Sequence, residues 1–193
     1  MQVSLISDLH LEFPSIVMRL PGGDVLLMAG DIFTAHPLRD FRQDATSRKA
    51  RDRYQRFCEE QLSKYQKVFY VMGNHEPYRE RIDETAGLIR DMLAAYAPNT
   101  RLLDNEVGAL YVPDPAPLKS VSAVAVLGTT LWAPCGVGTP DEWRIANAMR
   151  DFSVIRTPAP PPPGMTHFEG LRTFQPSDAH ALHQQAVEWL KEE

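Results

Sequence analysis

The chain has 193 residues, of which 44% are hydrophobic and 23% are charged, a composition typical of one globular domain with its own core. The formal net charge of −5 argues against a broad nucleic-acid-binding surface, and a cluster of basic side chains on one predicted helix is interleaved with acidic ones, as on a solvated face. The two cysteines are too few for a disulfide framework, and no apolar run approaches the roughly 18 residues that span a bilayer. We therefore expect a single domain over residues 1–193, soluble, cytoplasmic and without a membrane partner.

The first half of the chain alternates predicted strands and helices. Short apolar runs rich in β-branched residues predict buried strands at residues 2–7, 24–29 and 67–72. A helix is expected to begin near Ser47, a good N-cap residue, and a second helix is predicted from Ile82 to Tyr96. This order indicates an α/β fold.

The chain then becomes richer in predicted strands. Leu102–Leu103 and Ala109–Val112 flank a turn-forming segment and predict a hairpin. Residues 121–127 predict a further, strongly apolar strand. Strands that follow an α/β unit indicate a second sheet stacked on the first.

The last part of the chain is expected to contain two helices around a proline-rich segment. A short helix is predicted at residues 141–152 and a final helix from Ser177. Residues 158–164 carry too many prolines for a helix or a central strand, so they are predicted to form an exposed polyproline-like loop.

Polar residues follow three of the predicted strands, at the point where each strand ends. They are Asp8-Leu9-His10, Gly30-Asp31 and Gly73-Asn74-His75-Glu76. In open α/β sheets ligands bind in the crevice at the carboxyl ends of parallel strands, so these three runs are expected to open onto one crevice. Carboxylates, imidazoles and an amide are ligands suited to divalent first-row metals, and the sequence therefore predicts a metal site.

Each run by itself has an ordinary structural interpretation. An aspartate after a strand commonly caps the next helix, and Gly-Asn-His can form a simple turn. The presence of all three runs, in order and each after a strand, favours the functional interpretation. The pattern resembles the calcineurin-like metallophosphoesterase superfamily, in which D-x-H, G-D and G-N-H-E/D blocks precede a separate histidine and a G-H-x-H block.

This resemblance implies a two-sheet αββα sandwich that holds two divalent ions, Mn, Fe, Zn or similar. Asp8, His10 and Asp31 would bind the first ion, and Asp31 together with Asn74 would bind the second. His75 would stabilise or protonate the leaving-group oxygen during in-line attack of a metal-bridging hydroxide on phosphorus. Glu76 is expected to be an orienting partner or turn residue rather than a ligand.

The two later histidine blocks of the superfamily are absent from this chain. After Glu76 the histidines are His167, His180 and His183, and none lies in a G-H-x-H context. His180 and His183 are weak candidates for replacement ligands, and His36 is a weak candidate for contacting substrate. Because the early ligands are intact and the late ones are absent together, we expect the C-terminal strands of the sandwich to be missing through truncation, which would leave a sheet edge free for self-association.

The expected function is metal-dependent hydrolysis of a phosphomonoester or phosphodiester, with a small molecule or a nucleotide as the substrate. The alternative is a non-catalytic binding or regulatory domain that retains the phosphoesterase scaffold.

Overall fold

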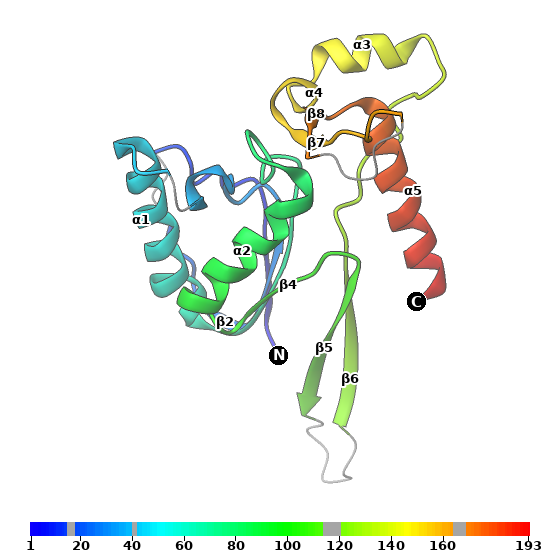
Figure 1. The fold of residues 1–193 in the computed structure, drawn as a ribbon. Coiled ribbons are helices and arrows are strands. Elements are labelled where there is room, and N and C mark those ends of the chain that lie inside the picture. Colours follow the sequence, from blue (N-terminus) through cyan, green and yellow to red (C-terminus); the bar gives the residue numbers. More distant parts are fainter. Residues whose placement is uncertain (15–17, 40–41, 114–120, 164–168) are drawn as a thin grey trace.

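A four-stranded parallel sheet organises the N-terminal half of the computed structural model, which describes residues 1–14, 18–39, 42–113, 121–163 and 169–193 (Figure 1). Its strands are hydrogen-bonded in chain order: β1 (Val3–Ile6), β2 (Gly23–Ala29), β3 (Tyr65–Val71) and β4 (Thr100–Leu102). All neighbouring pairs are parallel, so the carboxyl ends of the strands meet at one edge of the sheet. The three strands predicted for this half of the chain are confirmed, but the prediction that all three are buried is wrong for β1, an edge strand on which Val3 and Leu5 are exposed.

Helices α1 (Ala45–Glu60) and α2 (Ile82–Tyr96) lie on one face of the sheet (Figure 1). The strands alternate, so that Leu26 and Val68 are fully buried in the cluster that includes both helices, while their neighbours point to the other face. Helix α2 has the bounds that its sequence predicts. Two short 3₁₀ helices, η1 (His36–Leu38) and η2 (Leu62–Lys64), flank α1.

The helix predicted near Ser47 is present and begins at Ala45, but Ser47 is not its N-cap as predicted. The N-cap is Asp44, whose carboxylate accepts a hydrogen bond from the backbone N–H of Ser47 at 2.9 Å and another from its hydroxyl at 2.7 Å. The Asp44 carboxylate accepts both hydrogen bonds and is stabilised by the positive end of the helix dipole, so Asp44 rather than Ser47 is the N-cap. Ser47 lies inside the first turn and is buried.

An antiparallel hairpin packs on the second face of the sheet. Strands β5 (Glu106–Pro113) and β6 (Val121–Gly128) pair along their whole length, and Leu110 and Val126 pack against the buried cluster of Val25, Phe69 and Leu103. The approach is close, because a Cβ added to Gly108 would lie 2.4 Å from the Phe69 ring. This hairpin is the expected second sheet.

The predicted hairpin between Leu102–Leu103 and Ala109–Val112 is wrong in its pairing. Leu102 ends β4, which pairs with β3 in the parallel sheet, and the partner of residues 109–112 is β6. The unit β3–α2–β4 is a parallel crossover, and its helix favours return of the chain to the same sheet.

The C-terminal part begins with two helices, α3 (Asp141–Ala148) and α4 (Asp151–Val154), where the sequence predicts one. Met149 interrupts them because its backbone is extended, with φ −90° and ψ 130°. A two-stranded antiparallel sheet, β7 (Arg156–Pro158) with β8 (Leu171–Thr173), follows and was not predicted. The loop predicted over residues 158–164 begins too early, because Pro158 ends β7 and pairs with Leu171. The prolines at 160–163 are exposed as expected, while residue 164 lies outside the described ranges.

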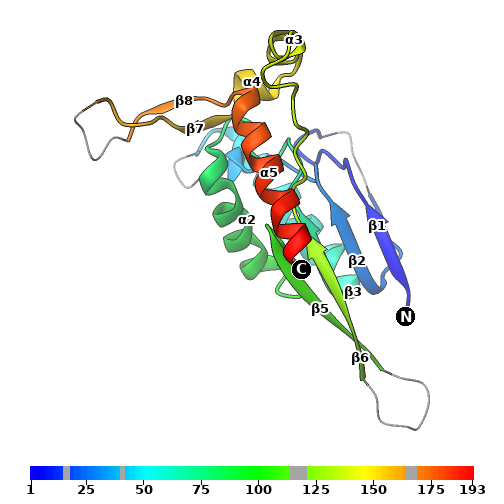
Figure 2. The same ribbon diagram turned by 90° about the vertical axis from the view of Figure 1, so that its right-hand side faces the viewer.

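Helix α5 (Pro176–Glu192) ends the chain, and it begins one residue before the predicted Ser177. Gln175 is its N-cap, and Asp178 accepts a hydrogen bond from the Gln175 backbone N–H at 2.8 Å. In Figure 1, α5 and the hairpin lie on the side of the parallel sheet opposite α1 and α2, and Figure 2 shows the same elements turned by 90°. No helix among the described residues has both the length and the apolar character needed to cross a membrane.

Candidate metal centre

Backbone hydrogen bonds hold the segments after β1 and β2 together beyond the ends of the strands. The N–H of Asp8 donates to the carbonyl of Gly30 at 3.1 Å, and the N–H of His10 donates to the carbonyl of Asp31 at 3.0 Å. The first two predicted runs therefore lie side by side at the carboxyl edge of the sheet, as their positions after parallel strands predict.

Three residues of these runs adopt left-handed backbone conformations. The φ angles are 55° for Asp8, 47° for His10 and 56° for Asp31. Residues other than glycine rarely adopt this region, and such strain persists where the surrounding structure enforces it, commonly at functional sites. This conformation, rather than regular strand geometry, determines the directions in which the three side chains point.

Asp8, His10 and Asp31 form a group that can hold a metal ion. One ligand atom from each residue lies within 4.8 Å of the corresponding atoms of the other two. Two carboxylates and one imidazole fit a divalent first-row cation in their donor types and in their spacing.

The turn after β3 touches the Asp31 loop directly, and two glycines allow this approach. A Cβ on Gly73 would lie 2.2 Å from Asp31 Oδ1, and a Cβ on Gly30 would lie 2.7 Å from the Gly73 nitrogen. The backbone N–H of His75 also donates to Asp31 Oδ1 at 2.9 Å. Asn74 lies between Gly73 and His75, in the turn that contacts Asp31.

Glu76 lies fully buried beneath these loops. Its carboxylate accepts hydrogen bonds from four donors: the backbone N–H groups of Asp31, Ile32 and Gly73, and the Tyr70 hydroxyl. Burial raises the pKa of Glu76 to about 7, against the hydrogen bonds from Tyr70, Ile32 and Gly73, which favour the carboxylate. Glu76 is an anchor of the two loops, consistent with the expected supporting role.

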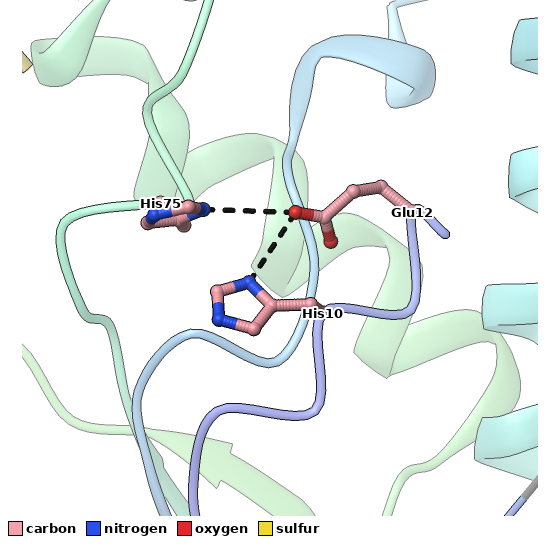
Figure 3. A group of neighbouring side chains, drawn as sticks. All are labelled: His10, Glu12 and His75. Atoms are coloured by element: carbon pink, nitrogen blue, oxygen red, sulfur yellow. Dashed lines mark ion pairs between the residues drawn. The ribbon is translucent and has the colours of Figure 1, made fainter. Parts of the chain in front are cut away.

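A second group, His10, Glu12 and His75, lies next to the first (Figure 3). Glu12 Oε1 is 3.4 Å from His10 Nδ1 and 3.7 Å from His75 Nδ1, and both imidazole nitrogens are buried without a hydrogen-bond partner among the described residues. Arg53 of α1 donates to the backbone carbonyl of Glu12 at 2.7 Å, which fixes this segment. One carboxylate is therefore shared by a candidate ligand and the candidate proton donor.

Glu12 is missing from the sequence prediction. The signal that could have found it is the alternation Asp8-Leu9-His10-Leu11-Glu12, in which both leucines are buried and the three polar residues occupy every second position. The role of Arg53 likewise differs from the solvated face expected for its helix.

Asp151 is the second residue at the site that was not predicted from the sequence. It starts α4, is only 3% exposed, and accepts a hydrogen bond from Asn74 Nδ2 at 2.8 Å. Tyr78 donates to its other oxygen at 3.2 Å, and the Tyr78 ring stacks on His75 with centroids 4.1 Å apart. Burial and the Asp151 carboxylate raise the pKa of Tyr78, which keeps its hydroxyl protonated. Asp151 lies 77 residues after Asn74, and no local motif marks it.

The remaining histidines lie outside both groups. His180 Nδ1 is 3.0 Å from the carbonyl of Pro134, and His183 Nδ1 is 2.5 Å from the carbonyl of Trp132, so both bind the backbone of the preceding segment. His36 begins η1, and burial lowers its pKa. His167 lies outside the described residues. Within the described ranges, the metal-binding groups contain neither His36, His180 nor His183.

Comparison with protein families agrees with this geometry. The family model for calcineurin-like phosphoesterases matches residues 1–173, which extends from β1 through the hairpin and α4 to β8. Comparison with curated proteins and with solved structures gives no match. Because the family model covers most of the chain, and the mixed α/β fold agrees with it, the chain belongs to the calcineurin-like phosphoesterase family.

Proposed function

We propose that this protein hydrolyses phosphomonoesters or phosphodiesters with two divalent cations as cofactors. The observation that carries the proposal is the convergence of Asp8, His10 and Asp31, all with left-handed backbones, beside the turn that bears Asn74 and His75. Closely spaced ligand side chains on strained backbone segments, at the carboxyl edge of a parallel sheet, are expected of a binding centre rather than of a scaffold.

The resemblance to calcineurin-like phosphoesterases implies how these side chains divide between the two cations. Asp8, His10 and Asp31 would hold the first ion, and Asp31 with Asn74 would hold the second, so that Asp31 serves both. Bound divalent cations would neutralise the phosphoryl oxygens and lower the pKa of water at the site. Manganese, iron and zinc all suit this mixture of oxygen and nitrogen donors.

His75 is the proposed proton donor to the leaving-group oxygen. Its side chain is 27% exposed, so substrate can reach it, and its Nδ1 faces Glu12. At 3.7 Å, the Glu12 carboxylate would attract a protonated imidazole at Nδ1, which leaves Nε2 for the reacting atom. Stacking on Tyr78 further restricts the ring.

A small molecule or a nucleotide is the proposed substrate. The net charge of −5 argues against a long nucleic acid, which requires an extended basic surface. The cytoplasm is the proposed location, because both cysteines are free and buried.

Hydrolysis of bis(p-nitrophenyl) phosphate and p-nitrophenyl phosphate with added Mn²⁺ tests the proposal. We expect metal-dependent turnover that is lost with a chelator, is abolished in Asp31→Asn and falls about 100-fold or more in His75→Ala, the range typical of a lost general acid. His180→Gln is the matched control, since that histidine lies outside both metal-binding groups.

Turnover that survives Asp31→Asn would contradict the proposal. A protein that binds Mn²⁺ but hydrolyses neither ester with Mn²⁺, Fe²⁺ or Zn²⁺ would instead favour the alternative, a binding or regulatory domain on the same scaffold.

A further inference from the structure

The side chain of Asn74 is held by a carboxylate from a distant part of the chain. Asn74 Nδ2 donates to Asp151 Oδ1 at 2.8 Å, and Nδ2 also lies 3.3 Å from the Tyr78 hydroxyl. The second Asp151 oxygen accepts from the same Tyr78 hydroxyl at 3.2 Å. Both oxygens of the buried Asp151 carboxylate therefore accept hydrogen bonds, one from Asn74 and one from Tyr78.

The chemistry of an amide makes this contact directional. An asparagine presents an oxygen acceptor and an NH₂ donor on two branches of nearly equal shape, and only the oxygen can bind a cation. An ionised carboxylate accepts hydrogen bonds and donates none, so Asp151 can pair only with the NH₂ branch. With Nδ2 on Asp151, the Oδ1 atom of Asn74 is turned away from it.

Hydrogen bonds and apolar packing hold the segment that carries Asp151 in place. The N–H of Arg79 donates to the Val154 carbonyl at 3.1 Å, and the N–H of Arg156 donates to the Glu80 carbonyl at 3.0 Å. Phe152 and Ile155, which follow Asp151 in the chain, are buried with Phe174 in a separate apolar cluster. This packing fixes α4 against the segment that follows the Asn74 turn.

We propose that Asp151 is a positioning residue that fixes the Asn74 amide so that Oδ1 faces the second cation. This inference rests on the proposed two-cation site. It assigns to a residue of α4 the orienting role that hydrogen-bonding partners commonly have around metal ligands. Asp151 acts through Asn74 and does not itself contact the cation.

Calorimetric titration of the metal-free protein with Mn²⁺ alone tests the inference without any substrate. Two binding steps are expected for the wild type. Asp151→Ala frees the amide to rotate and should weaken the second step about 10- to 100-fold while the first is retained, as is usual when an orienting partner is lost. Asp151→Asn should keep the second step close to its wild-type strength, because its amide oxygen still accepts from Asn74 Nδ2.

Asp141→Ala is the matched control. It removes an exposed carboxylate from the neighbouring helix α3, where it forms an ion pair with the exposed Arg144. Thermal melting of each metal-free variant establishes that it is folded.

A second pair of variants decides the matter if Asp151→Ala does not fold. Asn74→Asp places two carboxylates in contact, so the hydrogen bond between residues 74 and 151 is lost and the second Mn²⁺ step should weaken. Adding Asp151→Asn should restore both the hydrogen bond and the second Mn²⁺ step. No recovery in this double variant would overturn the inference.

The outcomes separate the possible roles. Loss of the second step in Asp151→Asn as complete as in Asp151→Ala would overturn the inference, since the carboxylate itself would then be the ligand. An unchanged second step in Asp151→Ala would also overturn it while leaving the two-cation proposal intact. A wild type that binds one Mn²⁺ only would overturn both.

Discussion

The buried carboxylate of Glu76 accepts a hydrogen bond from the backbone N–H of Asp31 at 3.1 Å, and so joins the loop after β2 to the turn after β3. The same oxygen accepts from the Gly73 N–H at 2.8 Å. One side chain, which is not itself a candidate ligand, thereby holds together two segments that carry candidate ligands.

Replacing Glu76 with alanine should destabilise the protein strongly. The change leaves three backbone N–H groups and the Tyr70 hydroxyl without their acceptor, and each buried unpaired donor costs about 1–3 kcal/mol. We expect a loss of about 3 kcal/mol or more in the free energy of unfolding, measured by urea denaturation. The exposed Glu188→Ala on α5 is the control, and a Glu76→Ala loss no larger than that of the control would contradict this role.

Gly73→Ala should disturb both stability and cation binding. Its Cβ would lie 2.2 Å from Asp31 Oδ1, a distance that forces Asp31 or the turn to move. Overpacking of this kind costs about 1–3 kcal/mol, and displacement of Asp31 should also weaken Mn²⁺ binding.

Gly87→Ala is the control for Gly73→Ala, and its expected effect on stability is the opposite. Gly87 lies in α2 with nothing within 4 Å of its added Cβ, so the substitution should stabilise the helix by about 0.5–1 kcal/mol. Equal effects of the two substitutions on Mn²⁺ affinity would show that the contact with Asp31 is unimportant.

Glu12→Ala should reduce Mn²⁺ affinity although Glu12 is outside the Asp8–His10–Asp31 group. Its carboxylate lies 3.4 Å from His10 Nδ1, the position from which a carboxylate orients a ligating imidazole, and loss of such a partner typically costs about 10–100-fold in metal affinity. Calorimetry measures the change, with the exposed Glu60→Ala of α1 for comparison. An unaltered Mn²⁺ affinity in Glu12→Ala would show that Glu12 does not support the metal centre.

The cap of α1 should make a small pH-dependent contribution to stability. The Ser47 hydroxyl, followed by its backbone N–H, lowers the pKa of Asp44 below its ordinary value of 3.8. Since the folded-state pKa is the lower one, the contribution is complete above pH 3.8 and is lost as the pH falls through the folded-state pKa.

Ser47→Ala should therefore raise the pKa of Asp44 toward 3.8, as followed by carboxyl ¹³C NMR titration. Thr46→Ala leaves the capping hydroxyl in place and should leave that titration unchanged. An identical Asp44 pKa in the Ser47 variant and the wild type would argue against the hydroxyl as the main cause.

Strand β1 should mediate self-association at high protein concentration. It is an edge strand of the parallel sheet (Figure 2), and its outward side chains Val3 and Leu5 are 48% and 68% exposed. Leu5→Glu should shift the protein toward the monomer in sedimentation velocity, whereas Leu190→Glu on α5 should not. A wild type that is monomeric at all concentrations would refute this expectation.

The sequence by itself determined the features that depend on short segments. Strands β1, β2 and β3 and helix α2 follow from apolar periodicity, and the grouping of Asp8, His10 and Asp31 follows because the ends of parallel strands share one edge. The N-cap of α1 was misjudged because Asp44 and Ser47, three residues apart, are both favourable cap residues, and the contacts of the Asp44 carboxylate with Ser47 decide between them.

Tertiary structure decided everything that depends on contacts between distant segments. The pairing of β5 with β6 rather than with residues 102–103 is a choice among partners that have similar local sequence. The contacts of Glu12 with two imidazoles and of Asp151 with Asn74 arise because packing brings separate segments together, and Asp151 lies 77 positions from its partner. Periodicity carries no information about such contacts, since the free energy that selects them comes from burial and hydrogen bonding in the assembled fold.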